Sequence, residues 1–541
     1  MDIFGKELIK KVFNLEKTDR TPWVPFVGCH GAKLLNISAQ KYLTSSKHII
    51  EGISKAIELY NPDGIPVVFD LQIEAEALGC ELAWSDHNPP AVVSHVLLGD
   101  KKLSDLKVPV KTDGRIPIFL EAAKSLHEKH PDVALYGLIT GPFTLALHLL
   151  GTDVFMKMME APDEVIELLE FTREVAENMA GYFIDAGCDV IAVVDPMTSQ
   201  IDPISFDLYV SQPATEIFQY IRERGALSSF FVCGHAQQNI EAMCACKPDN
   251  ISIDENIPLD FVRNIALENN ISFGGNMKLT VALLMGTTED VQQHALECLE
   301  AGGKEGFILA PGCDLPMDTP IENVQAVTQI VQDKYLQEVV RAKERSDMDI
   351  ALLNMKDYGI SNKVIVDIIT LDSESCAPCQ YMVEAVKRVA PHFEGIVEWR
   401  EHPIKKLEAV SFMNSLMVKN IPTICIDGKI TFVSQIPQKQ ELIAAIQKRI
   451  NEKLKMIISS HNAEILILGR TQEECIPVRE NVSIALRETG TSLQVHISTD
   501  ESTRLSYGIT TTPSLIIIDH KLKSQGEVPK VEIIREWLKD L

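Results

Sequence analysis

The chain has 541 residues, 45% of them hydrophobic, and this length corresponds to about two to four domains. Its net charge of −25 at pH 7 argues against nucleic acid and anionic membranes as partners. No apolar run approaches the roughly 18 residues of a membrane span and the N-terminus has no signal-peptide pattern, so we expect a cytoplasmic protein. The 12 cysteines then indicate metal, catalytic or redox thiols beside ordinary core thiols.

Up to about residue 335, strand-like apolar runs alternate with amphipathic helices. Eight strands separated by helices are typical of a (β/α)8 TIM barrel, in which parallel strands form the inner wall. The eight strands are predicted at Trp23–Gly28, Gly64–Asp70, Ala134–Thr140, Asp189–Asp195, Ser229–Cys233, Asn250–Asp254, Ile271–Gly275 and Gly306–Ala310.

Polar and metal-capable side chains gather where several of these strands end. Cys233 closes one apolar run and Cys313 follows another, at the face on which barrel active sites are built. In a cytosolic chain, two thiols that are distant in sequence but converge there indicate a metal more than a disulfide. Other strand ends carry Cys29, His30, Asp70, Thr140, Asp195, His235, Asp254, Glu255, Asn276, Lys278 and Asp314.

Two further α/β units are predicted after the barrel, and their similar layout suggests that they are diverged copies of one fold. Each has a strand, a helix that begins at a cysteine, a strand–turn–strand segment and a final helix. The predicted boundaries are 1–340 for the barrel, 341–360 for a charged linker, and 361–453 and 460–541 for the tail units.

Several motifs occur in order along the barrel, and together they resemble one known family. They are Phe69-Asp-Leu-Gln-Ile-Glu-Ala-Glu76-Ala-Leu-Gly79, Ile139-Thr-Gly-Pro-Phe-Thr-Leu145, Val194-Asp195-Pro196-Met-Thr-Ser199, Gly275-Asn276-Met277, Gly306-Phe-Ile-Leu-Ala-Pro-Gly-Cys313-Asp-Leu-Pro and Thr319-Pro-Ile-Glu322-Asn323. Residues 1–335 resemble the uroporphyrinogen decarboxylase superfamily, and within it the methylcobamide:thiol (coenzyme M-type) methyltransferase branch.

This resemblance implies methyl transfer between a methylcorrinoid (cobalamin-type) protein and a small thiol acceptor that zinc holds as a thiolate. The branch has a His-x-Cys-Gly motif and a later Gly-Cys-Asp motif. Cys233 and Cys313 match, but Phe231 stands where the histidine is expected and cannot ligate. His235 or His30 could supply the third ligand, in that order, and another soft or borderline metal would also fit. Alternatively, the two cysteines are relics packed at the barrel mouth.

Four other residues of these motifs are weaker candidates. Glu76 could serve as an oxygen ligand or hold the site open, and Asp195 could position the acceptor or the corrinoid. Asn276 and Ser199 could contact the cofactor. The alternative for Asp195, Asn276 and Ser199 is that they hold loops by hydrogen bonds.

The decarboxylase branch of the superfamily is a less favoured alternative. Its porphyrin-precursor substrate carries many carboxylates, and the branch has an arginine-rich segment after its first strand. The equivalent stretch here, residues 21–34, contains no arginine. Haem-pathway decarboxylation is therefore not expected.

In the first tail unit, Cys376-Ala-Pro-Cys379 stands between a predicted strand and helix, and Ile421-Pro422-Thr423 follows later. Together they resemble the redox motif and cis-proline of thioredoxins and glutaredoxins. The helix N-terminus stabilises the thiolate of Cys376, and Cys379 can resolve a mixed disulfide. A structural or metal-binding pair is the alternative. The second tail unit has only Cys475, so we expect it to be non-catalytic.

The leading hypothesis is a corrinoid-dependent methyltransferase with an appended redox module. A thiol–disulfide oxidoreductase whose barrel binds a client, and a corrinoid-binding module without chemistry, are the rivals. No Asp-x-His-x-x-Gly corrinoid motif is present, so the corrinoid would come from a partner protein or as free cofactor.

Overall fold

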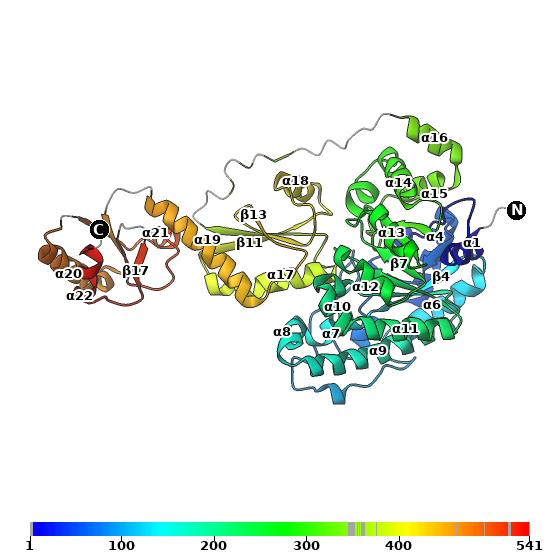
Figure 1. Ribbon diagram of the computed structural model, residues 1–541, viewed down its shortest axis with the longest axis horizontal. Helices are drawn as coiled ribbons and strands as arrows, with labels where there is room; N and C mark the ends of the chain where they lie inside the picture. Colours follow the sequence, from blue (N-terminus) through cyan, green and yellow to red (C-terminus); the bar gives the residue numbers. More distant parts are fainter. Residues whose placement is uncertain are drawn as a thin grey trace. The chain divides into compact units, whose positions relative to one another are not determined.

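The computed structural model describes residues 4–343, 352–353, 355, 358, 363–374, 376–459, 464–491, 493–517 and 521–539. Most of the predicted linker lies outside the described residues. The chain, whose course Figure 1 traces from blue at the N-terminus to red at the C-terminus, divides into two compact units, and the division does not follow the chain linearly. Unit 1 comprises Met1–Ala351, Leu371–Tyr381 and Pro403–Val410, and unit 2 comprises Leu352–Thr370, Met382–His402 and Ser411–Leu541.

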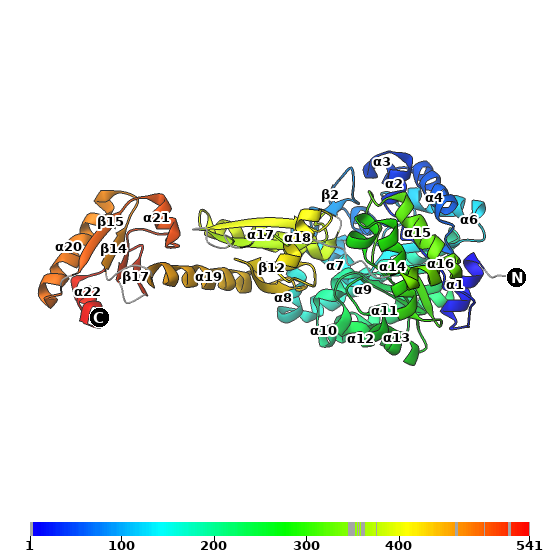
Figure 2. The ribbon, with the colours of Figure 1, turned by 90° about the horizontal axis from the view of Figure 1, so that it is seen from above.

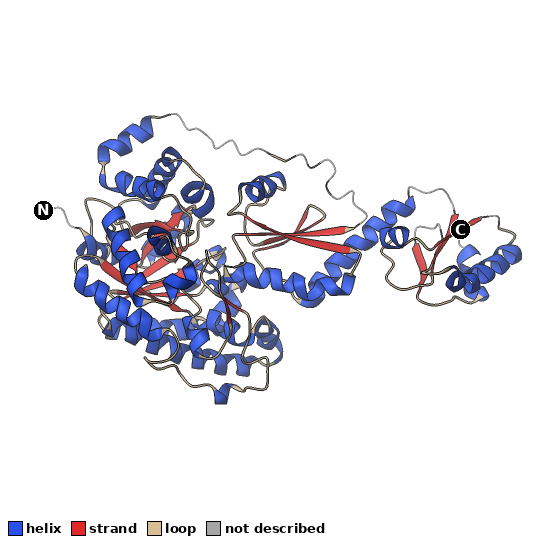
Figure 3. Ribbon diagram, turned by 180° about the vertical axis from the view of Figure 1, so that it is seen from behind, coloured by secondary structure: helices blue, strands red, loops and turns tan. Residues whose placement is uncertain are grey.

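Unit 1 contains a curled parallel sheet of seven strands in the order β1-β4-β5-β6-β7-β8-β9. The strands are runs of apolar and β-branched residues, and every residue of β4 and β5 is buried, as expected when helices cover a parallel sheet. Figure 3 shows the red strands enclosed by blue helices. The bounds are β1 Gly64–Pro66, β4 Ala134–Thr140, β5 Val190–Val194, β6 Leu227–Val232, β7 Asn250–Ile253, β8 Ser272–Met277 and β9 Phe307–Pro311.

The first predicted strand, Trp23–Gly28, is wrong as a strand. Only an isolated parallel bridge joins Trp23 to Leu309 of β9, where the Val24 amide donates to the Leu309 carbonyl at 3.0 Å. The Trp23 carbonyl accepts from the amide of Asp63, which directly precedes β1, at 2.9 Å. The segment thus connects both edges of the sheet. Pro22 precedes this segment and Pro25 lies within it, and because proline has no N–H the ladder cannot extend.

The helices of unit 1 surround this sheet, as the view from above shows (Figure 2). Helix α9 is amphipathic and buries apolar residues that recur at helical spacing, such as Leu168, Val175 and Met179. The bounds are α1 Gly5–Phe13, α2 His30–Leu35, α3 Ala39–Leu43, α4 Ser46–Tyr60, α5 Ile73–Ala77, α6 Ile116–Lys129, α7 Pro142–Leu150, α8 Asp153–Glu160, α9 Pro162–Asp185, α10 Pro203–Tyr209, α11 Ser211–Glu223, α12 Ile240–Ala245, α13 Leu259–Glu268, α14 Thr288–Gly302, α15 Ile321–Gln332 and α16 Lys334–Ala342.

Short elements fill the connections of unit 1. Strands β2 (Leu82–Ala83) and β3 (Ala91–Val92) pair antiparallel and form the β2–β3 hairpin. The short helical turns are η1 Leu103–Asp105, η2 Pro196–Gln200, η3 Gln237–Asn239 and η4 Leu279–Leu284.

Unit 2 carries two four-stranded sheets with corresponding strand orders, β11-β10-β12-β13 and β15-β14-β16-β17. In each sheet the third strand in chain order runs antiparallel to the first and the fourth. The repeated layout predicted for the tail is therefore present in the strand order. The bounds are β10 Val364–Thr370, β11 Val397–Pro403, β12 Thr423–Ile426, β13 Lys429–Val433, β14 Glu464–Leu468, β15 Gln494–Ser498, β16 Ser514–Ile517 and β17 Lys521–Gln525.

Each of these sheets has its own apolar core. Val366 and Ile368 of β10 share one cluster with Met382 and Val386, and Ile465 of β14 belongs to another. Separate cores are what two independent small folds require. The helices of this part are α17 Ala377–Val389, α18 Leu407–Ser415, α19 Lys439–Ser459, α20 Gln472–Thr489, α21 Glu501–Ser506 and α22 Val531–Lys539, with the turn η5 Ala390–Phe393.

None of the helices described here is long and apolar enough to cross a membrane.

Candidate functional site

The two strand-end thiols lie in contact. Cys233 directly follows β6 and Cys313 follows β9 by two residues, and their Sγ atoms are 2.7 Å apart. Two strands separate β6 from β9 in the sheet, so the curvature of the sheet brings the thiols together. Both side chains are half-buried. The site therefore presents a pair of sulfur atoms at the carboxyl ends of parallel strands, where barrel active sites lie.

Three buried phenylalanines form an apolar floor beneath this thiol pair. The ring of Phe231 lies 5.0 Å from that of Phe26 and 6.0 Å from that of Phe69, between centroids. Cys233 and Cys313 pack against the core cluster that contains all three rings. Phe231, at the position where the family pattern has histidine, therefore contributes apolar packing and keeps water from the underside of the thiols.

Half-buried carboxyl groups lie near the thiol pair. The Asp254 carboxylate accepts from the Gly234 amide at 3.0 Å, and that of Asp314 accepts from the Gly28 amide at 2.8 Å. Burial raises the pKa of both groups. Burial, together with the charge of Asp254, raises the pKa of the neighbouring Glu255 to about 8. The mouth thus presents carboxyl groups whose raised pKa values favour the protonated form.

The same surroundings act on Cys233. Burial first, and then the Cys313 sulfur and the charges of Asp254 and Asp314, raise the pKa of the Cys233 thiol well above its ordinary value. Since the thiolate is the reactive form, Cys233 needs a nearby cation or a disulfide partner before it can act chemically.

His235 is half-buried. It lies close enough to Asp254 to lower the pKa of that carboxyl group. Among the described residues, no group of three His, Cys, Asp or Glu side chains is arranged to hold a metal ion. The structure therefore does not join His235 to the two thiols as a third donor.

His30 is occupied elsewhere. Its Nδ1 is hydrogen-bonded with the Met317 carbonyl at 3.0 Å and its Nε2 with the Tyr60 hydroxyl at 2.6 Å. Burial lowers the pKa of His30 to about 4, so the ring is neutral at physiological pH. Because both ring nitrogens are hydrogen-bonded, His30 has no free nitrogen to ligate a metal at the thiol pair.

The thiol pair does not fit zinc. Structural and catalytic zinc sites use at least three protein ligands, and two thiolates bound to one tetrahedral zinc at about 2.3 Å lie about 3.8 Å apart. Here the sulfurs are 2.7 Å apart and the described residues bring no third ligand to them. Among the described residues, the thiol pair therefore supplies only two of the donors that the predicted zinc site needs.

Glu76 is held by an arginine that the sequence analysis did not single out. Arg115 donates from Nε to Glu76 at 2.6 Å and from a terminal nitrogen to Asp70 at 2.6 Å. The guanidinium also lies over the ring of Trp84, 4.8 Å from its centroid. No local sequence pattern marks Arg115, because its partners come from segments that precede it by about 40 residues. Glu76 is thus a partner of Arg115.

Asp195 serves the loop after β4. Its carboxylate accepts from the amides of Phe143 and Thr144, at 3.1 and 2.7 Å, and from the Thr144 hydroxyl at 2.6 Å. These donors belong to the first turn of α7, so Asp195 binds the positive end of that helix. Burial raises the pKa of Asp195 to about 6. These contacts correspond to the loop-holding alternative.

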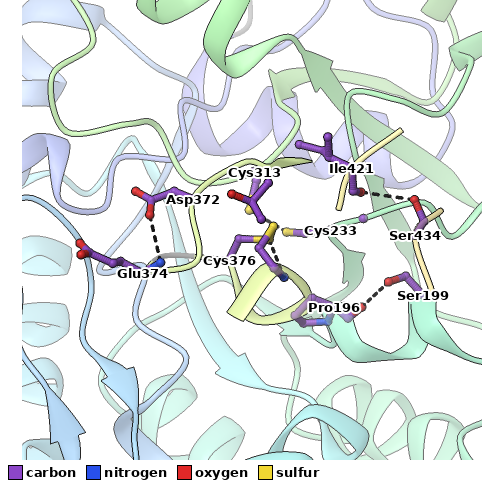
Figure 4. The surroundings of a disulfide bond; sticks show 12 residues. Pro196, Ser199, Cys233, Cys313, Asp372, Glu374, Cys376, Ile421 and Ser434 are labelled. Carbon is purple, nitrogen blue, oxygen red and sulfur yellow. Dashed lines mark hydrogen bonds between the residues drawn. A yellow bond between two sulfur atoms is a disulfide. The ribbon is translucent and has the colours of Figure 1, made fainter. Parts of the chain in front are cut away.

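Asn276 and Ser199 are also engaged with backbone. The Asn276 side chain donates to the carbonyls of Asp254 and Ile257 at 2.9 and 2.6 Å. The Ser199 hydroxyl donates to the Pro196 carbonyl at 2.7 Å (Figure 4). Asn276 therefore positions the acidic loop after β7, and neither residue has a contact that requires a cofactor.

The second cysteine pair forms a disulfide between Cys376 and Cys379, with Cα atoms 5.2 Å apart. Cys376 directly precedes α17, and Cys379 is buried in its first turn. In unit 2, Pro422 follows a cis peptide bond and directly precedes β12. The CxxC motif thus stands at a helix N-terminus, where the thiolate of the first cysteine is stabilised.

Cys475 differs from the redox pair. It lies in the first turn of α20, is fully buried, and belongs to the apolar core of its sheet. Burial raises the pKa of its thiol. Its surroundings are those of a core thiol, in agreement with the expectation of a non-catalytic unit.

A curled parallel sheet covered by helices, with a pair of thiols at its strand ends, defines a protein of the α/β-barrel class. The uroporphyrinogen decarboxylase (URO-D) family pattern matches residues 5–334, and the chain belongs to this family. A thioredoxin domain pattern matches residues 463–539.

Relatives of known activity resemble the barrel part. Methylcobamide:CoM methyltransferase MtbA of Methanosarcina acetivorans is 28% identical over 275 residues, which cover 50% of this chain and 80% of the relative. Methylcobamide:CoM methyltransferase MtaA of Methanosarcina barkeri is 29% identical over 283 residues, or 51% and 81% of the two chains. Uroporphyrinogen decarboxylase of Thermus thermophilus is 27% identical over 275 residues, or 49% and 77%.

Among solved structures, a methyltransferase from Methanosarcina mazei superposes with a TM-score of 0.57 at 25% identity. The match covers 61% of this chain and 99% of that one. The resemblance to the methyltransferase branch that the motifs predicted is therefore confirmed.

Proposed function

We propose that this chain transfers a methyl group between a methylcorrinoid and a small thiol at the barrel mouth, and that its CxxC pair is an appended redox module. The contact between Cys233 and Cys313 carries the proposal, because two soft sulfur groups at the carboxyl ends of parallel strands lie where barrel active sites are built. Relatives that are methylcobamide:CoM methyltransferases support the reaction class. The corrinoid protein as partner and the cytoplasmic location belong to the same proposal.

The carboxyl groups at the mouth favour methyl transfer over decarboxylation. A porphyrin precursor with many carboxylates requires cations, but Asp254, Glu255 and Asp314 surround the thiols. The buried Arg115 is already paired with Asp70 and Glu76, so its charge is compensated.

In the proposed reaction the acceptor thiolate attacks the methyl carbon of the methylcorrinoid. The sulfur–carbon bond forms, the cobalt–carbon electron pair stays on cobalt, and the thiol proton leaves to solvent. The phenylalanine floor closes the underside of the thiol pair, and Asp195 and Asn276 hold the loops that frame the mouth. Their contribution is orientation and the exclusion of water.

We derive no step through zinc, because the described residues supply only two of the donors that it needs. The predicted metal set of Cys233, Cys313 and His235 stays a proposal that metal analysis of the purified full chain decides. About one zinc per chain, lost when Cys313 is replaced by serine, would support it.

The test of methyl transfer is an anaerobic assay of the full chain with methylcobalamin and a small thiol such as 2-mercaptoethanesulfonate. Formation of the methyl thioether, followed by mass spectrometry, supports the proposal. Failure with every small thiol tested, when a methylcorrinoid protein is supplied as donor, would contradict it.

A thiol–disulfide oxidoreductase is the second candidate, favoured by the CxxC pair at the start of α17. It would reduce a disulfide-bonded client with electrons from an external dithiol. Disulfide reduction that is lost in Cys376→Ser, in a chain without methyl transfer activity, would favour this candidate.

A further inference from the structure

The CxxC pair lies in the same compact unit as the barrel thiols. Unit 1 includes Leu371–Tyr381 together with the barrel residues. Figure 4, which is drawn around the disulfide, shows Cys233 and Cys313 among the side chains in its surroundings. Two pairs of cysteines therefore share one region of unit 1.

The residues just before the CxxC motif are bound by the β2–β3 hairpin. The Glu374 carboxylate accepts from the Asn88 side chain at 3.0 Å and from the Ser85 hydroxyl at 3.4 Å. Lys405 donates to both Asn88 and Asp372, at 2.8 and 2.9 Å. Asn88 is buried, so these bonds lie partly out of water, where charged hydrogen bonds are stronger.

The residues just after the motif are bound as well. Gln380 donates from its side chain to the Val92 carbonyl of β3 at 2.7 Å. The Tyr381 hydroxyl is hydrogen-bonded with His148 Nδ1 of α7 at 3.1 Å, and both residues are fully buried. Breaking a buried hydrogen bond leaves an unpaired polar group, which destabilises the separated state. The segment that carries Cys376 and Cys379 is therefore held on both sides.

The two pairs have complementary chemistry. Cys376 directly precedes the 13-residue helix α17, whose N-terminus favours a thiolate. The Cys233 and Cys313 sulfurs are already in contact, so a disulfide between them needs little movement, and a third metal donor is absent from the described surroundings. One pair thus supplies a nucleophile and the other an acceptor.

We propose that the Cys376–Cys379 pair and the Cys233–Cys313 pair exchange their disulfide directly within one chain. The Cys376 thiolate attacks one sulfur of an oxidised Cys233–Cys313 pair, a mixed disulfide forms, and the other barrel sulfur leaves as a thiolate. The Cys379 thiolate then attacks Cys376, which forms the Cys376–Cys379 disulfide and frees the second barrel thiolate. Two electrons pass to the barrel, one disulfide breaks and one forms, and an external dithiol reduces the CxxC pair again.

This exchange goes beyond the proposed methyl transfer and does not rest on it. It makes the barrel mouth a redox-switched site, because only the reduced Cys233–Cys313 pair offers free thiols. The readout is the disulfide itself, so a chain that transfers no methyl group can still support or refute the exchange.

The experiment traps the mixed disulfide in the full-length Cys379→Ser variant, which cannot complete the second step. The variant is reduced, freed of reductant, oxidised with one equivalent of diamide, quenched with acid, alkylated and digested without reduction. Mass spectrometry should find Cys376 joined to Cys233 or Cys313, at a level at least about tenfold above that of the wild type. The fraction of chains that carry this mixed disulfide should not change on about tenfold dilution, because a bond within one chain does not depend on protein concentration.

A matched variant, Cys376→Ser/Cys379→Ser, should keep the barrel pair oxidised when limiting dithiothreitol is added, with re-reduction at least about tenfold slower than in the wild type. Circular dichroism of both variants establishes that they are folded. Cross-links to Cys29 or between chains, or equal re-reduction rates in folded protein, would overturn the proposal. A single metal ion lost equally on Cys313→Ser and Cys376→Ser would also overturn it, because the four thiols would then be ligands.

Discussion

The guanidinium of Arg115 lies 2.6 Å from the carboxylate of Asp70, and both side chains are almost completely withdrawn from solvent. The same guanidinium binds Glu76 at 2.6 Å and lies over two aromatic rings, those of Trp84 and Phe119. This one side chain ties the segment after β1 to the start of α6. Because these two carboxylates compensate its positive charge, Arg115 is not available to bind a polycarboxylate substrate.

Replacement of Arg115 by methionine should lower the free energy of unfolding by about 3–5 kcal/mol, because Asp70 would remain buried without a cation. The matched control is Lys111→Met, whose exposed pair with Asp185 should contribute less than about 1 kcal/mol. Urea unfolding at pH 7.5, followed by near-ultraviolet circular dichroism, measures both. Equal losses in the two variants would contradict this account of Arg115.

Cys233→Ser and Cys313→Ser should each lower kcat/KM for methyl transfer to a small thiol by at least about 100-fold, since each removes one of the two sulfurs at the mouth. Cys188→Ser is the control, because that thiol is buried but lies before β5, at the opposite ends of the strands. The assay is thioether formation from methylcobalamin. Retained activity in both mouth variants would remove the thiol pair from the mechanism.

Phe231→His restores the histidine of the family pattern beside Cys233. We expect the zinc content of the purified chain to rise above that of the wild type, because a third donor then stands beside the two thiols. Phe231→Leu is the control, since it also shortens the apolar floor but adds no donor. The zinc content is measured by inductively coupled plasma mass spectrometry. Equal zinc in Phe231→Leu and Phe231→His would refute the assignment of residue 231 as the position of the missing zinc ligand.

His30 should make the fold sensitive to acid. Burial lowers its pKa in the folded chain to about 4 from an unfolded value of about 6.5, so the unfolded state takes up the proton first as the pH falls. The stability contribution is complete above pH 6.5 and is lost as the pH falls towards 4, which amounts to about 2 kcal/mol between pH 7.5 and 5.

His30→Gln is the comparison for this pH dependence, because glutamine does not titrate. Between pH 7.5 and pH 5, the free energy of unfolding of His30→Gln should fall less than that of the wild type. The two proteins can differ in stability at pH 7.5, because only the change with pH is compared. His148 is also buried, and burial lowers its pKa in the same sense, but it is present in both proteins and cancels in the difference. Identical pH slopes in urea unfolding would show that His30 does not titrate as described.

Asn88→Ala should slow disulfide exchange within the chain, because Glu374 and Lys405 both lose a partner on the β2–β3 hairpin. We expect the rate of mixed-disulfide formation in the Cys379→Ser background to fall about three- to tenfold, for a loss of about 1 kcal/mol in positioning. Asn178→Ala, on the exposed face of α9, is the control. An unchanged rate would mean that the hairpin does not position the CxxC segment.

The parallel strands and the family motifs could be predicted from the sequence with few errors. Buried apolar runs predicted six of the seven strands nearly as they are, and β1 in part, because side-chain burial on both faces of a strand is a local property. The first strand failed because Pro22 and Pro25 remove the amides that a ladder needs, although the segment keeps its place between the sheet edges.

The candidate site could be predicted from the sequence only in part. That thiols follow β6 and β9 is visible in the chain, as is the placement of Cys376 at a helix start. That His30 has no free nitrogen is not visible, since its partners Met317 and Tyr60 come from other segments.

The sequence by itself determined the class of barrel, the sulfur groups at its strand ends and the CxxC helix start, because these depend on periodicity and on neighbours along the chain. Only the tertiary structure decided that the Cys233 and Cys313 sulfurs touch, that Phe231 closes an apolar floor beneath them, and that residues 371–381 belong with the barrel. The physical reason is that distances between segments, and the occupancy of polar atoms, follow from packing between residues far apart in sequence.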